Sequence, residues 1–214
     1  MASDVTLGID LGTTTVKVIA MTAHDEAVIG SWCCGTKASV VSDAGRLASE
    51  QDVRKIISAV DDCLVEIPAN LASRVTKIGV SGQMHGIVLW TRQPRTAEDK
   101  ISSSSLSLSE HLSIHFPILS NLYTWQDGRC STDFLTSLPS PESHLRIATG
   151  FGCCTLFWLN HHEPGCVERY HSAATVQDLL VTVLCDLDQP VMSYHNAASW
   201  GYFDPVTAAW NTNV

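Results

Sequence analysis

The chain has 214 residues, of which 45% are hydrophobic and 16% are charged, enough apolar material for one large or two small domains with a buried core. Its formal net charge of −9 excludes broad electrostatic attraction to nucleic acid or to an acidic membrane, so we expect neither as a partner. No apolar run reaches membrane-spanning length, and the first residues lack the basic start and long apolar stretch of a secretion signal.

The cysteines favour reduced thiols. The sequence contains eight of them, including the adjacent pairs Cys33-Cys34 and Cys153-Cys154, and the chain is too long for a small disulfide scaffold. No Cys-x-x-Cys spacing occurs, so a structural zinc site is poorly supported. We therefore predict a cytoplasmic protein.

The chain begins with a predicted β-hairpin. Two runs rich in β-branched and apolar residues, Val5–Ile9 and Val16–Met21, flank a Gly-Thr-Thr-Thr turn, which is the pattern of two strands joined by a glycine turn. A third strand is predicted at Ala27–Cys34.

The polar residues of this hairpin suggest a site for Mg²⁺ and phosphate. We expect Gly12 to supply a positive φ and a close approach to the backbone. The hydroxyls of Thr13, Thr14 and Thr15 stand beside backbone N–H groups that can bind an anion. Asp10 would repel phosphate unless a divalent cation lay between them, so we predict it as the metal ligand. An ordinary hairpin with a polar tip is the alternative, and the spacing is not that of a Walker loop.

A helix and two more strands follow. Apolar residues at helical spacing predict a helix over Glu50–Ile67, with Ser49 as a cap and Pro68 as a stop. Strands are predicted at Val75–Val80 and Ile87–Trp90. This order predicts an α/β fold with a mixed five-stranded sheet flanked by helices, one of which crosses a face of the sheet.

The remaining chain is less regular. Residues 92–113 begin with charges and continue as a run of serine and leucine, which predicts an exposed, flexible loop. A loop leading into a short strand is predicted over Ser193–Asp204. Helices are predicted at Thr132–Leu138, Pro141–Thr149, Cys154–Asn160 and Ala173–Cys185.

A second group of candidate residues follows directly on a predicted strand, between Gly82 and Gly86. The carboxyl end of a sheet strand is a favoured place for ligand contacts. Gln83 offers a donor and an acceptor, and His85 can bond a hydroxyl through either ring nitrogen. A histidine satisfied within the core is the alternative.

A third group lies at Trp125-Gln-Asp-Gly-Arg129. The indole offers a flat apolar surface for a sugar ring, while Asp127 and Arg129 supply acceptors and fork-like donors for its hydroxyls. A structural ion pair between Asp127 and Arg129 is the alternative. Asn196, Ser199 and Trp200 form a weaker cluster.

In combination these segments resemble the FGGY carbohydrate kinases. Asp10-Leu-Gly-Thr-Thr-Thr-Val-Lys17 is similar to the first phosphate loop of that family, and Ser81-Gly-Gln-Met-His-Gly86 is similar to its sugar-site turn. Trp125-Gln-Asp-Gly-Arg129 and Asn196-Ala-Ala-Ser199 match further family segments. The resemblance extends from about Thr6 to Trp210 and is strongest to the vertebrate sedoheptulokinase branch.

The resemblance implies an actin-like, ribonuclease H-like ATPase domain, the first of the two domains of a sugar kinase. Residues 1–214 would form this N-terminal domain, incomplete at its C-terminal end. The general-base aspartate and most of the adenosine site would lie in the missing second domain of the same chain, so we expect the chain by itself to be inactive.

By this resemblance the full-length protein phosphorylates a ketose, sedoheptulose, to its 7-phosphate, with ATP and Mg²⁺. Asp10 would hold the metal. Cofactor binding would fall to Asp10, Gly12, Thr13, Thr14, Thr15 and Lys17, and sugar binding to Gln83, Met84, His85, Trp125, Asp127 and Arg129.

Three alternatives remain. The chain could be a non-catalytic sugar-binding or regulatory fragment. It could belong to a xylulokinase-like pentulose kinase. A chaperone-like or filament-forming ATPase would share the hairpin, but it would not explain Gln83-Met-His-Gly86.

Overall fold

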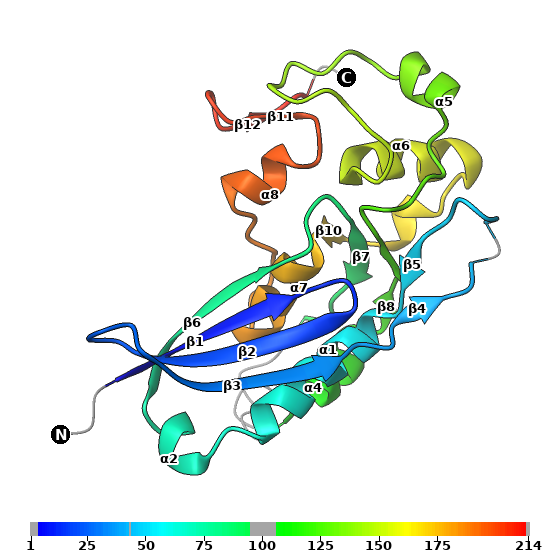
Figure 1. Cartoon of the computed structure of the whole chain (residues 1–214). Coiled ribbons are helices and arrows are strands. Elements are labelled where there is room, and N and C mark those ends of the chain that lie inside the picture. The colour runs from blue at the N-terminus through cyan, green and yellow to red at the C-terminus, as the bar shows by residue number, and fades with distance from the viewer. Residues whose placement is uncertain (1–3, 43, 95–105, 213–214) are drawn as a thin grey trace. The chain divides into compact units, whose positions relative to one another are not determined.

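The computed structural model describes residues 4–42, 44–94 and 106–212, and its ribbon is drawn in Figure 1. These residues form two compact units, each of which is built from separate stretches of the chain. The first unit comprises the described parts of 1–38, 54–83 and 95–114, and the second those of 39–53, 84–94 and 115–214. No helix among the described residues is both long enough and apolar enough to cross a membrane.

The first unit is built on a mixed four-stranded sheet in the order β3-β2-β1-β6 (Figure 1). The strands β1 (Val5–Leu11) and β2 (Thr15–Thr22) form the predicted hairpin, and β3 (Val28–Gly35) adds an antiparallel edge. On the other side β6 (Val75–Gly82) pairs with β1 in parallel. The hairpin, the third strand and the mixed sheet are therefore confirmed.

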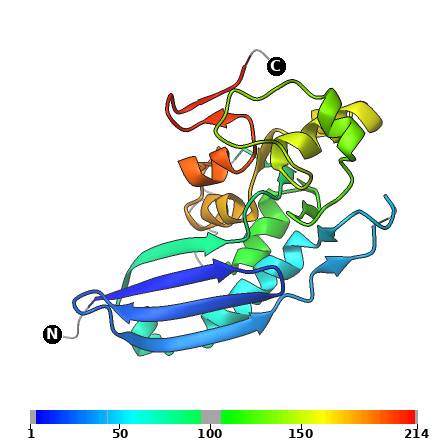
Figure 2. The same cartoon turned by 45° about the horizontal axis from the view of Figure 1, so that its top comes forward.

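One face of this sheet is buried against helix α1 (Val53–Val65), as Figure 2 shows. Buried and half-buried residues alternate along β1, because successive side chains of a strand point to opposite faces. The thiol of Cys63 on α1 lies 3.9 Å from the carbonyl oxygen of Val16. The buried apolar side chains include Leu7, Ile9, Leu11, Val16 and Val18 from the sheet and Ile56, Ile57 and Val60 from the helix.

Helix α1 is shorter than the sequence predicted. It begins at Val53 because Glu50 and Gln51 form a strand, β5 (Glu50–Gln51), that pairs with two other strands. It ends at Val65, and Pro68 instead precedes the short helix α2 (Ala69–Ala72).

The loop predicted over 92–113 is wrong from Leu108 onward, where helix α4 (Leu108–His115) begins. Residues 95–105 lie outside the described part of the chain. The serine-rich start of α4 forms a helix because Ser107 and Glu110 bond each other's backbone and side chain in a capping box. In addition, the carboxylate of Asp61 on α1 accepts hydrogen bonds from the amides of Leu108 and Ser109, each at 2.9 Å.

The second unit contains two further three-stranded sheets. In one, β7 (Val88–Thr91) lies between β10 (Ser172–Ala174) and β8 (Ile118–Leu119). In the other, β5 lies between β4 (Ser39–Val40) and β9 (Leu122–Tyr123). The fifth strand predicted for the main sheet is thus wrong, because the segment that supplies it, β7, hydrogen-bonds to β8 and β10 instead.

Helices complete the second unit: α5 (Thr132–Ser137), α6 (Gly152–His162), the 3₁₀ turn η2 (Val167–Arg169), α7 (Val176–Leu184) and α8 (Tyr194–Ala198). They are followed by the hairpin β11 (Phe203–Asp204) and β12 (Ala209–Trp210). The helix predicted from Ala173 begins only at Val176, because β10 extends to Ala174.

Two other predictions in this unit are wrong. The helix predicted over Pro141–Thr149 is absent from this described stretch. Its main-chain groups are used elsewhere, since the Asn211 side chain binds both the amide and the carbonyl of Glu142. The loop predicted from Ser193 is instead helix α8, because the Ser193 hydroxyl caps it by accepting from the Asn196 amide.

Candidate functional site

The hairpin tip requires glycine at position 12 for a steric reason. The Gly12 amide donates to the carbonyl oxygen of Thr15 at 3.0 Å, and a Cβ at residue 12 would lie only 2.8 Å from that oxygen. The predicted positive φ is not found at Gly12, so this part of the prediction was wrong. The close approach of Thr15, rather than a left-handed backbone, excludes a side chain here.

Thr36, which directly follows β3, binds the main-chain carbonyl groups of the hairpin tip. The Thr36 amide donates to the carbonyl oxygen of Thr14 at 2.9 Å, and the Thr36 hydroxyl lies 3.4 Å from the carbonyl oxygen of Thr13. The hydroxyls of Thr14 and Thr15 lie 3.2 Å apart at the surface. The carbonyl groups of Thr13 and Thr14 therefore accept hydrogen bonds from Thr36, while the hydroxyls of Thr14 and Thr15 remain at the surface.

Asp10 lies on the face of the sheet opposite the core. In the strand register it is paired with Lys17 on β2 and with Ser81 on β6, and paired residues present their side chains on the same face. The Ser81 hydroxyl donates to the Asp10 carboxylate at 3.4 Å. A carboxylate, an ammonium group and a hydroxyl thus share one face at the end of the sheet beside the tip.

This donor set fits a hydrated Mg²⁺ better than a metal enclosed by protein. Among the described residues no group of three or more His, Cys, Asp or Glu side chains could hold a metal ion. Mg²⁺ commonly keeps several waters and binds through one or two carboxylates together with substrate phosphates. Asp10 is suited to that mode of binding.

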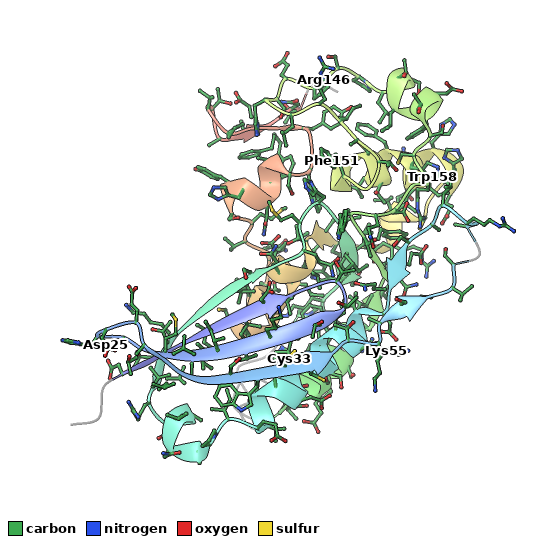
Figure 3. The ribbon with its side chains drawn as sticks, in the orientation of Figure 1. Asp25, Cys33, Lys55, Arg146, Phe151 and Trp158 are labelled. Carbon is green, nitrogen blue, oxygen red and sulfur yellow. The ribbon has the colours of Figure 1, made fainter. Side chains whose placement is uncertain are left out.

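His85 is held in an unusual backbone conformation in the second unit. Its φ of 68° lies in the left-handed region, which few residues other than glycine adopt. Its amide donates to the Ser199 hydroxyl at 3.3 Å, and its Nδ1 lies 2.8 Å from the Ser199 carbonyl oxygen. The imidazole stacks on Phe151, with ring centroids 4.5 Å apart and the planes 5° from parallel. Figure 3 labels Phe151 at the start of α6.

The residues beside His85 belong to both units. Met84 lies in the second unit with 37% of its surface exposed. Gln83 is the last residue of the preceding stretch of the first unit, where its amide donates to the Leu11 carbonyl oxygen at 2.9 Å.

Trp125 presents an exposed aromatic ring from a tight turn. It is 46% exposed, and the backbone of Gly150 packs so closely that a Cβ there would lie 2.3 Å from the Trp125 carbonyl oxygen. A Cβ at Gly86 would similarly lie 2.6 Å from the Tyr123 carbonyl oxygen. The His85–Gly86 segment and the segment leading to Trp125 are therefore in direct backbone contact.

Asp127 and Arg129 form the ion pair that the sequence left open as an alternative. Arg129 Nε and Nη2 donate to the two carboxylate oxygens of Asp127 at 2.8 and 2.9 Å. Nη2 also lies 2.6 Å from Glu50 Oε1. The Arg129 side chain is 3% exposed and that of Asp127 is fully buried.

Aromatic rings enclose this ion pair. The Arg129 guanidinium lies 4.5 Å from the ring centroid of Tyr123 and 5.1 Å from that of Trp158, which is labelled on α6 in Figure 3. Burial opposes the charge of Arg129, but hydrogen bonds to Asp127 and Glu50 outweigh this effect and raise its pKa. For Glu50, burial by itself raises the pKa of the carboxyl group. Hydrogen bonds from Asn121, Ser42 and Arg129 outweigh burial, so the pKa of Glu50 is lowered overall.

The three residues of the weaker cluster, Asn196, Ser199 and Trp200, have two different structural roles. Asn196 and Ser199 belong to α8 and its C-terminal cap, whereas Trp200 packs in the core with Ile87, Leu89 and Leu159. Sequence reasoning missed Glu50 because its position fitted a helical pattern. It also missed Phe151 and Asp178, although the spacing Thr175-x-x-Asp178 signals the capping box that α7 shows.

Comparison with known proteins identifies the family. Residues 5–113 match the model of the FGGY family of carbohydrate kinases, N-terminal domain, so the chain belongs to this family. It is 44% identical to sedoheptulokinase of Mus musculus, over 98% of this chain and 44% of that protein. It is 42% identical to sedoheptulokinase of Homo sapiens, over 100% of this chain and 45% of that protein. The resemblance inferred from the sequence is thereby confirmed.

More distant relatives share the fold. Xylulose kinase of Escherichia coli is 28% identical over 81% of this chain and 32% of its own length. A ligand-bound xylulose kinase from Lactobacillus acidophilus matches with a TM-score of 0.70 at 16% identity, over 98% of this chain and 39% of that one. Plasmodium falciparum glycerol kinase with ADP matches with a TM-score of 0.72 at 17% identity, over 99% of this chain and 40% of that one. The chain thus spans less than half the length of the relatives it matches.

Proposed function

We propose that the full-length protein phosphorylates a ketose with ATP and Mg²⁺ in the cytoplasm, converting sedoheptulose to sedoheptulose 7-phosphate. The observation that carries the proposal is the placement of Asp10 beside the threonine-rich tip, on a face shared with Lys17 and Ser81. Membership of a carbohydrate kinase family supports ATP as the donor, and the sedoheptulokinase relatives support the substrate.

On the phosphate side, this chain supplies charge neutralisation and positioning, which are the main demands of phosphoryl transfer. Asp10 would hold Mg²⁺ or one of its waters. Gly12 allows the tip to close tightly, and the threonines at 13, 14 and 15 with Lys17 would meet the terminal phosphates. Bound Mg²⁺ would offset the charge that these phosphates bring near Asp10.

On the sugar side, Gln83, Met84 and His85 would line one wall, and Trp125 would lie against the apolar face of the ring. Asp127 and Arg129 complete the predicted set. Their buried ion pair supports a structural role, in which it stabilises the turn that carries Trp125. The second proposed role is a direct hydrogen bond from Arg129 to a hydroxyl of the sugar. The general base is proposed to come from the part of the full-length protein that this chain does not contain.

The test is steady-state kinetics on the full-length protein with sedoheptulose, ATP and Mg²⁺. We expect Asp10→Ala to lower kcat at least about a hundredfold, since it removes the charge that organises the phosphates, while the KM for sedoheptulose changes little. Asp4→Ala, which removes an exposed carboxylate of the same unit, is the matched control. An Asp10→Ala enzyme with near-normal turnover would contradict the phosphate-site assignment.

A pentulose is the second candidate substrate, because xylulose kinases are among the relatives in both sequence and structure. The ratio of kcat/KM for sedoheptulose to that for xylulose decides between them. Calorimetry that detects sugar binding without turnover would instead support a non-catalytic sugar-binding protein.

A further inference from the structure

We propose that Asp178, Asn196 and Ser199 form a hydrogen-bonded chain that fixes the tautomer of His85. In this arrangement Nδ1 carries the proton, and Nε2 is presented as an acceptor for a hydroxyl of the ketose. The identity of that ligand rests on the proposed function, whereas the tautomer and the three positioning residues follow from the contacts within the second unit.

The tautomer follows from the partner of Nδ1. That atom lies 2.8 Å from the Ser199 carbonyl oxygen, and a carbonyl oxygen can only accept a hydrogen bond. Nδ1 must therefore carry a hydrogen. In a neutral imidazole the other nitrogen, Nε2, is then an acceptor, so it recognises a group that donates, such as a sugar hydroxyl.

The ring has little freedom to leave this arrangement. It stacks on Phe151, and the His85 amide is bonded to the same residue, Ser199, that holds Nδ1. A left-handed backbone at a residue with a side chain carries a steric cost. The contacts to Ser199 on both the backbone and the ring offset that cost and fix the direction of Nε2.

The position of Ser199 depends in turn on Asn196. Ser199 follows α8, and its hydroxyl donates to the Asn196 carbonyl oxygen at 2.7 Å. The Asn196 side-chain amide donates to Asp178 Oδ1 at 2.9 Å and lies 3.3 Å from the Thr175 hydroxyl. Because Asn196 is 6% exposed and Asp178 4% exposed, water cannot readily replace these bonds.

Asp178 anchors the chain at the start of α7. Its Oδ2 accepts from the Thr175 amide at 3.1 Å and from the Thr175 hydroxyl at 2.6 Å, which leaves Oδ1 for Asn196. The bonds thus run from the N-terminus of α7, through α8, to the histidine. We infer that Asp178, Asn196 and Ser199 are positioning residues for sugar recognition.

The first experiment measures the tautomer by nitrogen NMR on the full-length protein labelled with ¹⁵N-histidine. The His85 signals are assigned by their loss in His85→Asn, whose side-chain amide can still donate to the Ser199 carbonyl and which tolerates a left-handed backbone. We expect the shift of a protonated Nδ1 and of an unprotonated Nε2 in the sugar-free protein. A protonated Nε2 with a bare Nδ1 would overturn the proposal.

The second experiment tests the positioning residues through Asn196→Ala. We expect mixed His85 tautomers and a KM for the ketose raised about five- to tenfold, the equivalent of one lost hydrogen bond, with the KM for ATP unchanged. Asn211→Ala is the matched control, since Asn211 also bonds through its side chain, but to the Glu142 backbone. Unchanged His85 shifts and sugar KM in Asn196→Ala would refute the positioning role.

Ser199→Ala covers the case in which Asn196→Ala fails to fold. It removes only the hydroxyl that links His85 to Asn196, and it keeps the carbonyl that holds Nδ1. We expect the Nδ1-protonated tautomer to persist while the KM for the ketose rises, and an unchanged KM would contradict the proposal. If the wild-type protein phosphorylates no ketose but the NMR results hold, the proposed function fails and the positioning chain stands.

Discussion

Replacing Arg129 with alanine separates its two candidate roles. The substitution removes a guanidinium that binds Asp127 through two donors and Glu50 through one. Asp127 is fully buried, so its carboxylate would lose its charged partner without gaining water. If Arg129 served only to bind sugar, the same substitution would weaken sugar binding and leave the fold intact.

The expected loss of stability is large. Removing one partner of a buried ion pair costs about 3–5 kcal/mol, because the remaining charge is left uncompensated. For a folded chain of roughly 150–250 residues, a range that includes this 214-residue chain, each kcal/mol lowers Tm by about 2–4 °C, so we expect a fall of roughly 6–20 °C. A sugar contact alone would leave Tm unchanged and weaken binding by about 1–3 kcal/mol.

The assay is thermal unfolding of the full-length protein, followed by circular dichroism, beside the KM for sedoheptulose. Arg146→Ala is the matched control, because Arg146 is an exposed arginine of the same unit. Arg129→Lys keeps the charge but not the two-donor fork, so we expect an intermediate loss. A Tm for Arg129→Ala within about 1 °C of wild type would refute the reasoning from the buried ion pair.

Two further predictions concern packing and pH. Gly152→Ala should lower the free energy of unfolding by about 1–3 kcal/mol, because its Cβ would lie 2.3 Å from the buried Trp200 ring. Urea unfolding beside Gly79→Ala, whose Cβ would have no neighbour closer than 3.9 Å, checks this, and equal losses would contradict it. Since the folded state lowers the pKa of Glu50 from 4.5, its contribution to stability should be present above pH 4.5 and be lost as pH falls through the folded pKa. Tm should therefore depend less on pH in Glu50→Gln than in wild type below this value, and identical slopes would argue against it.

Local sequence patterns determined the hairpin, the third strand and the main helix of the first unit, but not helix α4. The β-branched runs around Gly12 predicted the hairpin, and the helical spacing from Val53 onward predicted the helix that crosses the sheet. Both predictions succeeded because these elements are specified by residues close to one another in the sequence. The same patterns identified the polar hairpin tip. The spacing Ser107-x-x-Glu110 is also that of a capping box. The serine-rich composition of the surrounding segment nevertheless led to the prediction of a loop.

Only the tertiary structure decided which strands pair and which polar groups meet. The segment Val88–Thr91 has the same apolar character whichever sheet it joins, and its hydrogen bonds to β8 and β10 connect residues far apart in sequence. The sequence likewise left the role of Arg129 open, since Glu50 lies 79 positions away. The contact of His85 with Ser199 spans 114 positions. Motif chemistry names the candidate residues, but burial and partners set by long-range packing determine what each of them can do.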